Sequence, residues 1–167
     1  TVVGADTPTV TFDRARGLGS GYERNEEILV IELDQPAKIA PWRALEKECG
    51  VKVGMVRMVP ETGELDWDDF SRQLTGRTKL VAIGAASNAL GTINDVKRAG
   101  KLAHSSGAKI FVDAVHYAPH GFIDVRDWNC DFLVCSAYKF YGPPVGVLYG
   151  GPDRLGSSDL PKLYTPP

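Results

Sequence analysis

The 167-residue sequence predicts an α/β fold in which helices cover both faces of a mostly parallel sheet. Strand-like apolar runs alternate with helix-like segments, the connections between them are short, and no internal repeat interrupts the alternation. The expected strands occupy residues 28–32, 51–59, 80–85, 109–112 and 131–135, and the expected helices residues 40–49, 66–74 and 95–106. This order of elements indicates a three-layer α/β/α architecture.

Local signals support the individual elements. The helix expected at 40–49 has Pro41 near its start and Gly50 just past its end, which are residue types typical of those positions. Residues 51–59 alternate between apolar and polar side chains, as a strand does. The helix at 66–74 places three apolar side chains on one face: Trp67, Phe70 and Leu74.

Composition and charge exclude several classes of protein. With 43% hydrophobic and 24% charged residues, the sequence is that of a globular domain rather than a disordered chain. A net charge of −2 and a pI near 5.9 give no reason to expect binding to nucleic acid or to an anionic membrane. No run approaches the roughly 18 apolar residues that a membrane span needs.

The three cysteines show no pattern of a disulfide framework or a metal site. Cys49, Cys130 and Cys135 form no CxxC pair and no metal-ligand spacing. We therefore expect free thiols that pack as small apolar groups, in a protein of the reducing cytoplasm, and no bound metal.

Two charged residues follow neighbouring apolar runs and are candidates for a site. Asp113 ends the run at 109–112, and Lys139 comes shortly after the run at 131–135. In an open parallel sheet, ligands bind beyond the carboxyl ends of the strands, so these side chains could face one pocket. Taken alone, a lysine and an aspartate at strand ends are more often solvated charges.

Short motifs surround these two residues and extend upstream through most of the chain. They are Val112-Asp113-Ala114, Ala118-Pro119-His120, Ile123-Asp124-Val125, Cys130-Asp131-Phe132, Ser136-x-x-Lys139-x-Tyr141-Gly142-Pro143, Ser87-Asn88-Ala89-Leu90-Gly91-Thr92 and Pro41-Trp42. Together they resemble the fold-type-I enzymes that use pyridoxal 5′-phosphate (PLP), specifically the cysteine desulfurase or class-V aminotransferase branch.

The resemblance implies a role for each residue of the central motifs. Lys139 would form the Schiff base with PLP, and Asp113 would keep the pyridine nitrogen protonated so that the ring accepts electrons. Ser136 would donate its hydroxyl to the phosphate. Tyr138 stands where the family often has a histidine, and its phenol can still donate a hydrogen bond.

Further positions implied by the resemblance lie elsewhere in the chain. His116 would face the phenolic oxygen of the cofactor, and Asn88 would lie near that oxygen and the substrate carboxylate. Thr7 would belong to a turn that faces the phosphate, although Asp6 and Pro8 interrupt the family pattern there and an ordinary capped helix with Pro8 in its first turn is the alternative. Two positions depart from the family pattern, because Gln35 replaces the histidine that stacks on the ring and Lys38 replaces an asparagine. Glutamine can cover the ring but cannot act as imidazole in proton transfer.

On this basis residues 1–167 are expected to form a single PLP-binding large domain, without the N-terminal segment and the C-terminal small domain of the family. The expected function is that of a cysteine desulfurase-like or class-V aminotransferase-like protein, acting on a small amino acid as a homodimer, with the chain alone inactive. None of the three cysteines is assigned the role of desulfurase nucleophile. The alternative is a catalytically silent PLP-fold domain with a structural or interaction role. A nucleotide-binding α/β domain is disfavoured, because the sequence lacks a GxGxxG or P-loop pattern.

Overall fold

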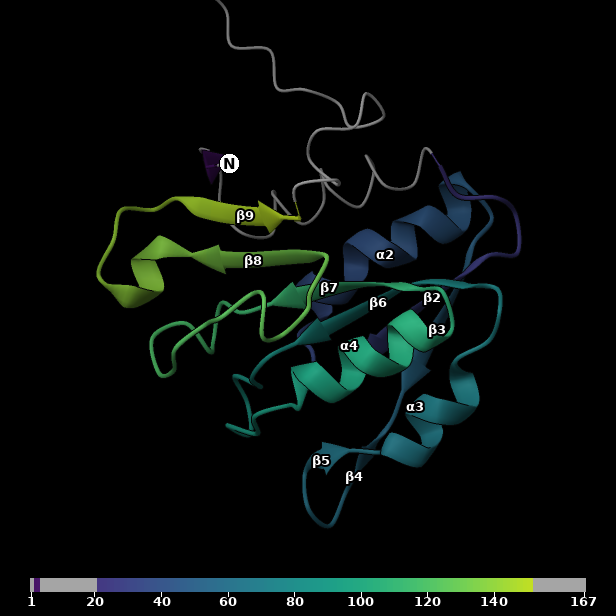
Figure 1. Ribbon diagram of the computed structural model, residues 1–167, viewed down its shortest axis with the longest axis horizontal. Helices are drawn as coiled ribbons and strands as arrows, with labels where there is room; N and C mark the ends of the chain where they lie inside the picture. The colour runs from purple at the N-terminus through teal and green to yellow at the C-terminus, as the bar shows by residue number, and fades with distance from the viewer. Residues whose placement is uncertain (1, 4–20, 152–167) are drawn as a thin grey trace, which may run out of the picture.

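The computed structural model describes residues 2–3 and 21–151 (Figure 1). Its elements in chain order are β1 (Val2–Val3), β2 (Glu27–Ile31), α2 (Pro36–Glu48), β3 (Lys52–Val56), β4 (Met58–Val59), β5 (Glu64–Leu65), α3 (Trp67–Gln73), β6 (Thr78–Gly84), α4 (Val96–Ser105), β7 (Lys109–Asp113), β8 (Phe132–Ser136), the 3-10 helix η1 (Ala137–Phe140) and β9 (Gly146–Gly150). Thr7 lies outside the described residues, so its predicted role remains a prediction.

A seven-stranded sheet forms the centre of the molecule, in the order β1-β9-β8-β7-β6-β2-β3. The strands from β3 to β8 in this order run parallel to their neighbours, whereas β9 is antiparallel to both β8 and β1. The prediction of a mostly parallel sheet is confirmed. The antiparallel strand β9 was not predicted, because its glycine-rich sequence lacks the long apolar run that marks the other strands.

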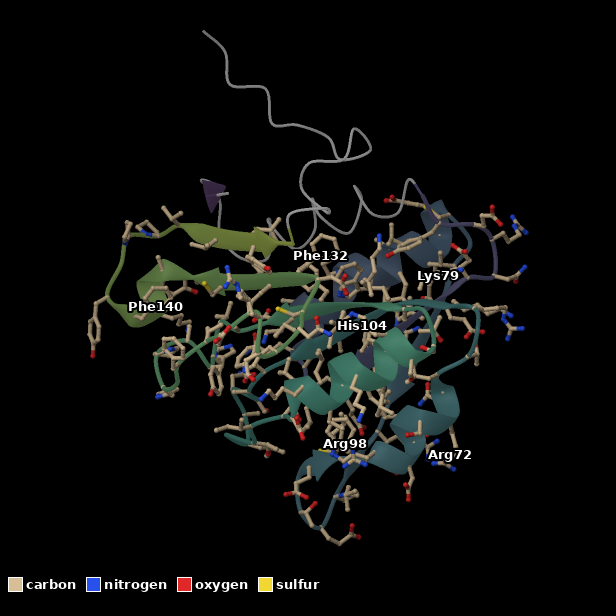
Figure 2. All side chains as sticks on the ribbon, in the orientation of Figure 1. Arg72, Lys79, Arg98, His104, Phe132 and Phe140 are labelled. Carbon is tan, nitrogen blue, oxygen red and sulfur yellow. The ribbon has the colours of Figure 1, made fainter. Side chains whose placement is uncertain are left out.

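Helices cover the two faces of the sheet and give the predicted three layers (Figure 1). On one face, Trp42 of α2 packs edge-on against Phe111, with ring centroids 5.3 Å apart. On the other face, α3 and α4 bury Phe70 and Ala99 against the sheet. Arg98 of α4 lies over the Trp67 ring of α3, 4.4 Å from its centroid, and joins these two helices (Figure 2). Among the described residues, no helix has both the length and the apolar character that a membrane crossing requires.

The predicted start of the helix at 40–49 is wrong. Helix α2 begins at Pro36, and Pro41 lies inside it with its ring buried. Proline is well suited to the first helical position, where the N–H that it lacks would have no partner inside the helix. From the sequence alone either proline could occupy that position, and the pattern favoured Pro41, but the structure places Pro36 there. The earlier start brings Lys38 into the first turn of the helix.

The strand predicted at 51–59 is interrupted. It divides into β3 and β4 at Arg57, whose N–H donates to the Asp69 carboxylate at 2.9 Å and whose C=O accepts the N–H of Asp66, also at 2.9 Å. Strand β4 then pairs with β5 as a short hairpin separate from the main sheet. The alternating pattern continues through Arg57, so the sequence did not indicate the break.

The carboxyl ends of the parallel strands meet at one edge of the sheet, where η1 follows β8 (Figure 1). Gly84 at the end of β6 pairs with Asp113 at the end of β7, and Asp113 pairs with Val134 of β8. This register brings the segments that follow β2, β6, β7 and β8 together. It is the edge at which open α/β sheets bind their ligands.

Candidate active site

Asp113 is the central carboxylate of this edge. Its side chain retains 9% exposure. Its Oδ1 accepts the N–H of Val115 at 2.9 Å and lies 3.3 Å from Nζ of Lys38. No described residue donates a hydrogen bond to Oδ2. Among the described residues, the hydrogen bond and the ion pair therefore both fall on Oδ1, and Oδ2 is left as an acceptor.

Lys38 lies between two buried carboxylates. Its Nζ is 3.3 Å from Asp113 Oδ1 and 3.9 Å from Asp34 Oδ1. The side chains of Lys38 and Asp34 are 13% and 7% exposed. Asp34 is also held by the N–H of Gly84, which donates to Oδ2 at 3.1 Å. We call Asp34, Lys38 and Asp113 the carboxylate–lysine cluster.

The electrostatics of this cluster favour a proton on Asp34. Burial, and to a smaller degree the negative charge of Asp113, raise the pKa of Asp34 to about 7 against the lowering effects of Lys38 and the Gly84 N–H. At neutral pH the cluster therefore takes up and releases a proton at Asp34.

His116 follows β7 and is half-buried beside the cluster. Burial lowers its pKa, and the positive charges of Lys38 and Lys139 lower it further, with Asp113 opposing them. The imidazole is therefore neutral at physiological pH, with one ring nitrogen as donor and the other as acceptor. The charges of Lys38, Lys139 and Asp113 therefore all influence the protonation of His116.

Ser136 at the end of β8 carries a hydroxyl without a partner. Its Oγ is fully buried and makes no hydrogen bond in the structure. Leaving a buried polar group unpaired costs about 1–3 kcal/mol, so such groups are uncommon and require an explanation. A ligand atom that accepts or donates a hydrogen bond here would relieve that cost.

Lys139 lies in η1, three residues after Ser136, and its side chain is exposed. Its Nζ is 5.4 Å from the centroid of the Tyr138 ring, and Tyr138 itself is 50% exposed. Tyr141 ends η1 in the left-handed conformation, with a φ of 67°. The amine is thus accessible at the same edge of the sheet as the unpaired acceptor and the unpaired hydroxyl.

A pocket of about 440 Å³ opens beside the cluster, between the loop after β2 and the turn after β6. Gln35 and Asn88 both line it, together with Glu32, Asp34, Met58 and Leu90. Gln35 is the residue just before α2 and makes no capping hydrogen bond with its side chain. Its amide and that of Asn88 are therefore both placed where they could contact a ligand.

The structure gathers the described candidates at one edge of the sheet. Asp113 and His116 adjoin the carboxylate–lysine cluster, Gln35 and Asn88 share the pocket, and the remaining three follow β8: Ser136, Tyr138 and Lys139. Sequence reasoning did not assign Asp34 and Lys38 to the site. The available signal was Lys38 itself, a lysine at a position where the family resembled has asparagine.

Comparison with known proteins places the chain in a family. The Aminotransferase class-V family model matches residues 14–163. The chain belongs to the aminotransferase class-V family. It is 36% identical to a cysteine desulfurase of Synechococcus elongatus over 86% of the chain and 23% of that relative. It is 35% identical to a cysteine desulfurase of Dickeya dadantii over 81% of the chain and 33% of that relative.

Solved structures of class-V family members agree with the fold. The cysteine desulfurase CsdA of Escherichia coli matches with a TM-score of 0.85 and 30% identity, over 92% of this chain and 39% of that one. The apo cysteine desulfurase of Thermococcus onnurineus matches with a TM-score of 0.84 and 32% identity, over 91% of this chain and 38% of that one. The chain spans about a third or less of the length of the two relatives from Synechococcus elongatus and Dickeya dadantii.

Proposed function

We propose that this chain forms the PLP-binding domain of a cysteine desulfurase-like class-V aminotransferase that acts on a small amino acid. The class-V family and its cysteine desulfurases depend on PLP. The observation that carries the proposal is the arrangement at the ends of β7 and β8: a buried carboxylate with one unused oxygen, a buried unpaired hydroxyl and an exposed lysine amine.

The residues present fit PLP. Oδ2 of Asp113 would accept the N–H of the ring nitrogen, and the unpaired Oγ of Ser136 would donate to the phosphate. Nζ of Lys139 would attach covalently to the cofactor aldehyde. When bound, PLP supplies an electron sink for the bond that breaks at the substrate α-carbon. We place Tyr138, Asn88 and Gln35 around the same ligand.

Gln35 restricts how protons can move in this site. An amide covers an aromatic ring but has no titratable nitrogen. Proton transfer then falls to Nζ of Lys139 and to the imidazole of His116, whose lowered pKa leaves one nitrogen free to accept a proton near neutral pH. The positive charge of Lys139 lowers the pKa of His116, so the protonation states of the two groups are linked.

We further propose that the protein acts as a homodimer. Large side chains on and just after η1 are exposed, with Tyr141 at 105% and Phe140 at 39%. Apolar side chains exposed together beside a catalytic lysine suit contact with a second copy.

The departure at Gln35 favours a second candidate, a catalytically silent PLP-fold domain. In that case the fold would be kept for contact with a partner, and the unpaired groups of the site would bind no cofactor. The two candidates differ in whether Lys139 reacts.

Incubation with PLP followed by borohydride reduction and peptide mapping tests the proposal. We expect a single stable modification on Lys139, because that amine is accessible at the edge where Asp113 and Ser136 have unused hydrogen-bonding capacity. Lys139→Ala should abolish the modification, whereas Lys101→Ala, at an exposed lysine of α4, should leave it complete. Equal labelling of the Lys139→Ala chain, or no stable labelling at all, would favour the silent domain.

A further inference from the structure

Lys38 is an unusual lysine in this chain, because its side chain is only 13% exposed. Lysine is rarely buried unless its charge is paired. It enters the site from the first turn of α2, four residues after Asp34, and its Nζ reaches Asp113 on the strand end across the edge of the sheet. The ammonium thus joins the loop after β2 to the carboxylate at the end of β7.

The contacts of Lys38 leave Asp113 with one oxygen still available. A carboxylate offers two oxygens, each with two acceptor sites. The ammonium and the N–H of Val115 both use Oδ1. Because an ion pair and a hydrogen bond hold the same oxygen, rotation of the carboxylate is restrained and Oδ2 keeps its acceptor sites.

We propose that Lys38 is a positioning residue for Asp113: it fixes the carboxylate through Oδ1, so that Oδ2 accepts the N–H of a cationic ring nitrogen. This inference rests on the proposed function, in which Asp113 binds the nitrogen of the cofactor ring. The inference assigns a role to Lys38, which stands where the family pattern has an asparagine. Lys38 acts through Asp113 and does not itself contact the reacting atoms.

The charges around the cluster support this role over one in which Lys38 competes with the ring. The groups that face the cluster are Asp34, Asp113 and Lys38 itself, with His116 and Lys139 close enough to interact. Without Lys38, two buried carboxylates would have no counter-ion, and such pairs favour holding one proton between them. Lys38 lowers the pKa of Asp34, against the raising effects of burial and of Asp113. Its charge therefore opposes the sharing of a proton between the two carboxylates, which would occupy an oxygen of Asp113.

Two non-covalent cofactor analogues isolate this effect. Pyridoxine 5′-phosphate and its analogue with CH in place of the ring nitrogen both lack the aldehyde, so neither can attach to Lys139. Their affinities are measured by calorimetry at pH 7.5 for the wild-type chain and for Lys38→Met, Lys38→Arg, Asp113→Asn and Lys101→Met. Loss of a charge-assisted hydrogen bond corresponds to roughly tenfold or more in affinity.

We expect Lys38→Met to bind the nitrogen-containing analogue about tenfold more weakly, with the CH analogue bound as in the wild type. Lys38→Arg should restore the preference for nitrogen, because a guanidinium keeps the charge and the donors. Lys101→Met should change neither affinity. A merely structural role predicts equal weakening of both analogues, and that result would overturn the proposal, as would unchanged or tighter binding of the nitrogen analogue.

The Asp113→Asn arm separates this inference from the function on which it rests. If Asp113→Asn loses the preference for nitrogen and Lys38→Met keeps it, the role of Lys38 is wrong and the proposed function stands. If the wild type shows no preference for nitrogen, Asp113 does not bind the ring and both are wrong. Should Lys38→Met fail to fold, Lys38→Gln supplies the same comparison with a neutral side chain that remains polar.

Discussion

Two buried aspartates at opposite ends of the sheet show how a structural charge differs from a site. Asp131 precedes β8 and Asp113 ends β7. As whole residues, Asp131 is 9% exposed and Asp113 is 7% exposed. Oδ2 of Asp131 accepts the N–H of Ile110 at 2.9 Å and is 2.8 Å from Nε2 of His104. Asn129 reaches the other ring nitrogen of that histidine at 3.2 Å. His104 comes from the last turn of α4 and ties that helix to the sheet (Figure 2).

The two ends differ in what their polar groups leave unused. At the amino end of β8, Asp131, His104 and Asn129 form a chain of mutual hydrogen bonds. At the carboxyl end, Asp113 keeps an unused oxygen and Ser136 a buried hydroxyl with no partner. The two aspartates are buried to nearly the same extent. Unused hydrogen-bonding capacity, rather than a buried carboxylate, therefore distinguishes the end that we propose binds a ligand.

The largest difference between the two ends should appear in the pH dependence of stability. Asp34 has a pKa of about 7 in the folded chain, whereas an unfolded aspartate titrates near pH 4. The folded state binds this proton more tightly, so the contribution of Asp34 to the free energy of unfolding is greatest below about pH 4 and is lost as the pH rises to about 7. At about 1.4 kcal/mol per pKa unit, this fall amounts to at most about 4 kcal/mol.

Asp34→Asn should remove this fall, because asparagine can still accept the Gly84 N–H and carries no proton to lose. Urea unfolding at intervals from pH 4 to 8 measures it, with Glu61→Gln as a control that removes one exposed negative charge. The variant should gain stability over the wild type progressively as the pH rises. Parallel curves for Asp34→Asn and the wild type would show that Asp34 titrates alike in both states.

The second prediction compares the same substitution, aspartate to asparagine, at the two ends of the sheet. Asp113→Asn should weaken PLP binding by roughly ten- to hundredfold, and it should also cost some stability because it removes a buried counter-ion of Lys38. Asp131→Asn should lower the free energy of unfolding by about 1.5–3 kcal/mol, since it weakens hydrogen bonds to a charged group within the fold, and should leave PLP binding unchanged. Spectroscopic titration with PLP and urea unfolding of both variants provide the comparison. The contrast between the ends fails if both variants lose stability equally and bind PLP equally.

The smallest effect is expected at Ser136. Ser136→Ala removes a buried hydroxyl that has no partner, so the cofactor-free chain should keep its stability or gain up to about 1 kcal/mol. The same variant should bind PLP several-fold more weakly while binding pyridoxal, which lacks the phosphate, as the wild type does. Ser106→Ala is the matched control, because the Ser106 hydroxyl donates to the C=O of Ala103 at 2.8 Å and its loss should destabilise the chain. A clear loss of stability in cofactor-free Ser136→Ala would contradict the reading of Ser136 as an unpaired group.

The parts of the site that the sequence predicts are those carried by single segments. Asp113, Ser136 and Lys139 each follow an apolar run, so their position at strand ends could be inferred from local pattern and motif. The contact of Lys38 with Asp113 joins residues far apart in the chain, and it depends on where α2 begins. Two prolines made that start ambiguous. The strand break at Arg57 depends on contacts with Asp66, just before α3, and with Asp69 within α3. Tertiary contacts decided both, and no local pattern encodes them.

The close approach of Gly84 to Asp34 links the substitutions that these two positions tolerate. Its backbone is ordinary strand, so no torsion angle requires glycine there, but a Cβ at this position would overlap Oδ1 of Asp34 and lie 3.6 Å from Nζ of Lys38. Alanine at position 84 therefore requires the carboxylate of Asp34 to move, and is accommodated without that movement only where a shorter side chain occupies position 34. The two positions are thus coupled, and the order in which they mutate decides whether the cluster is disturbed. A lineage that acquired a side chain at position 84 first would lose the carboxylate's place beside Lys38 before it could find a substitute.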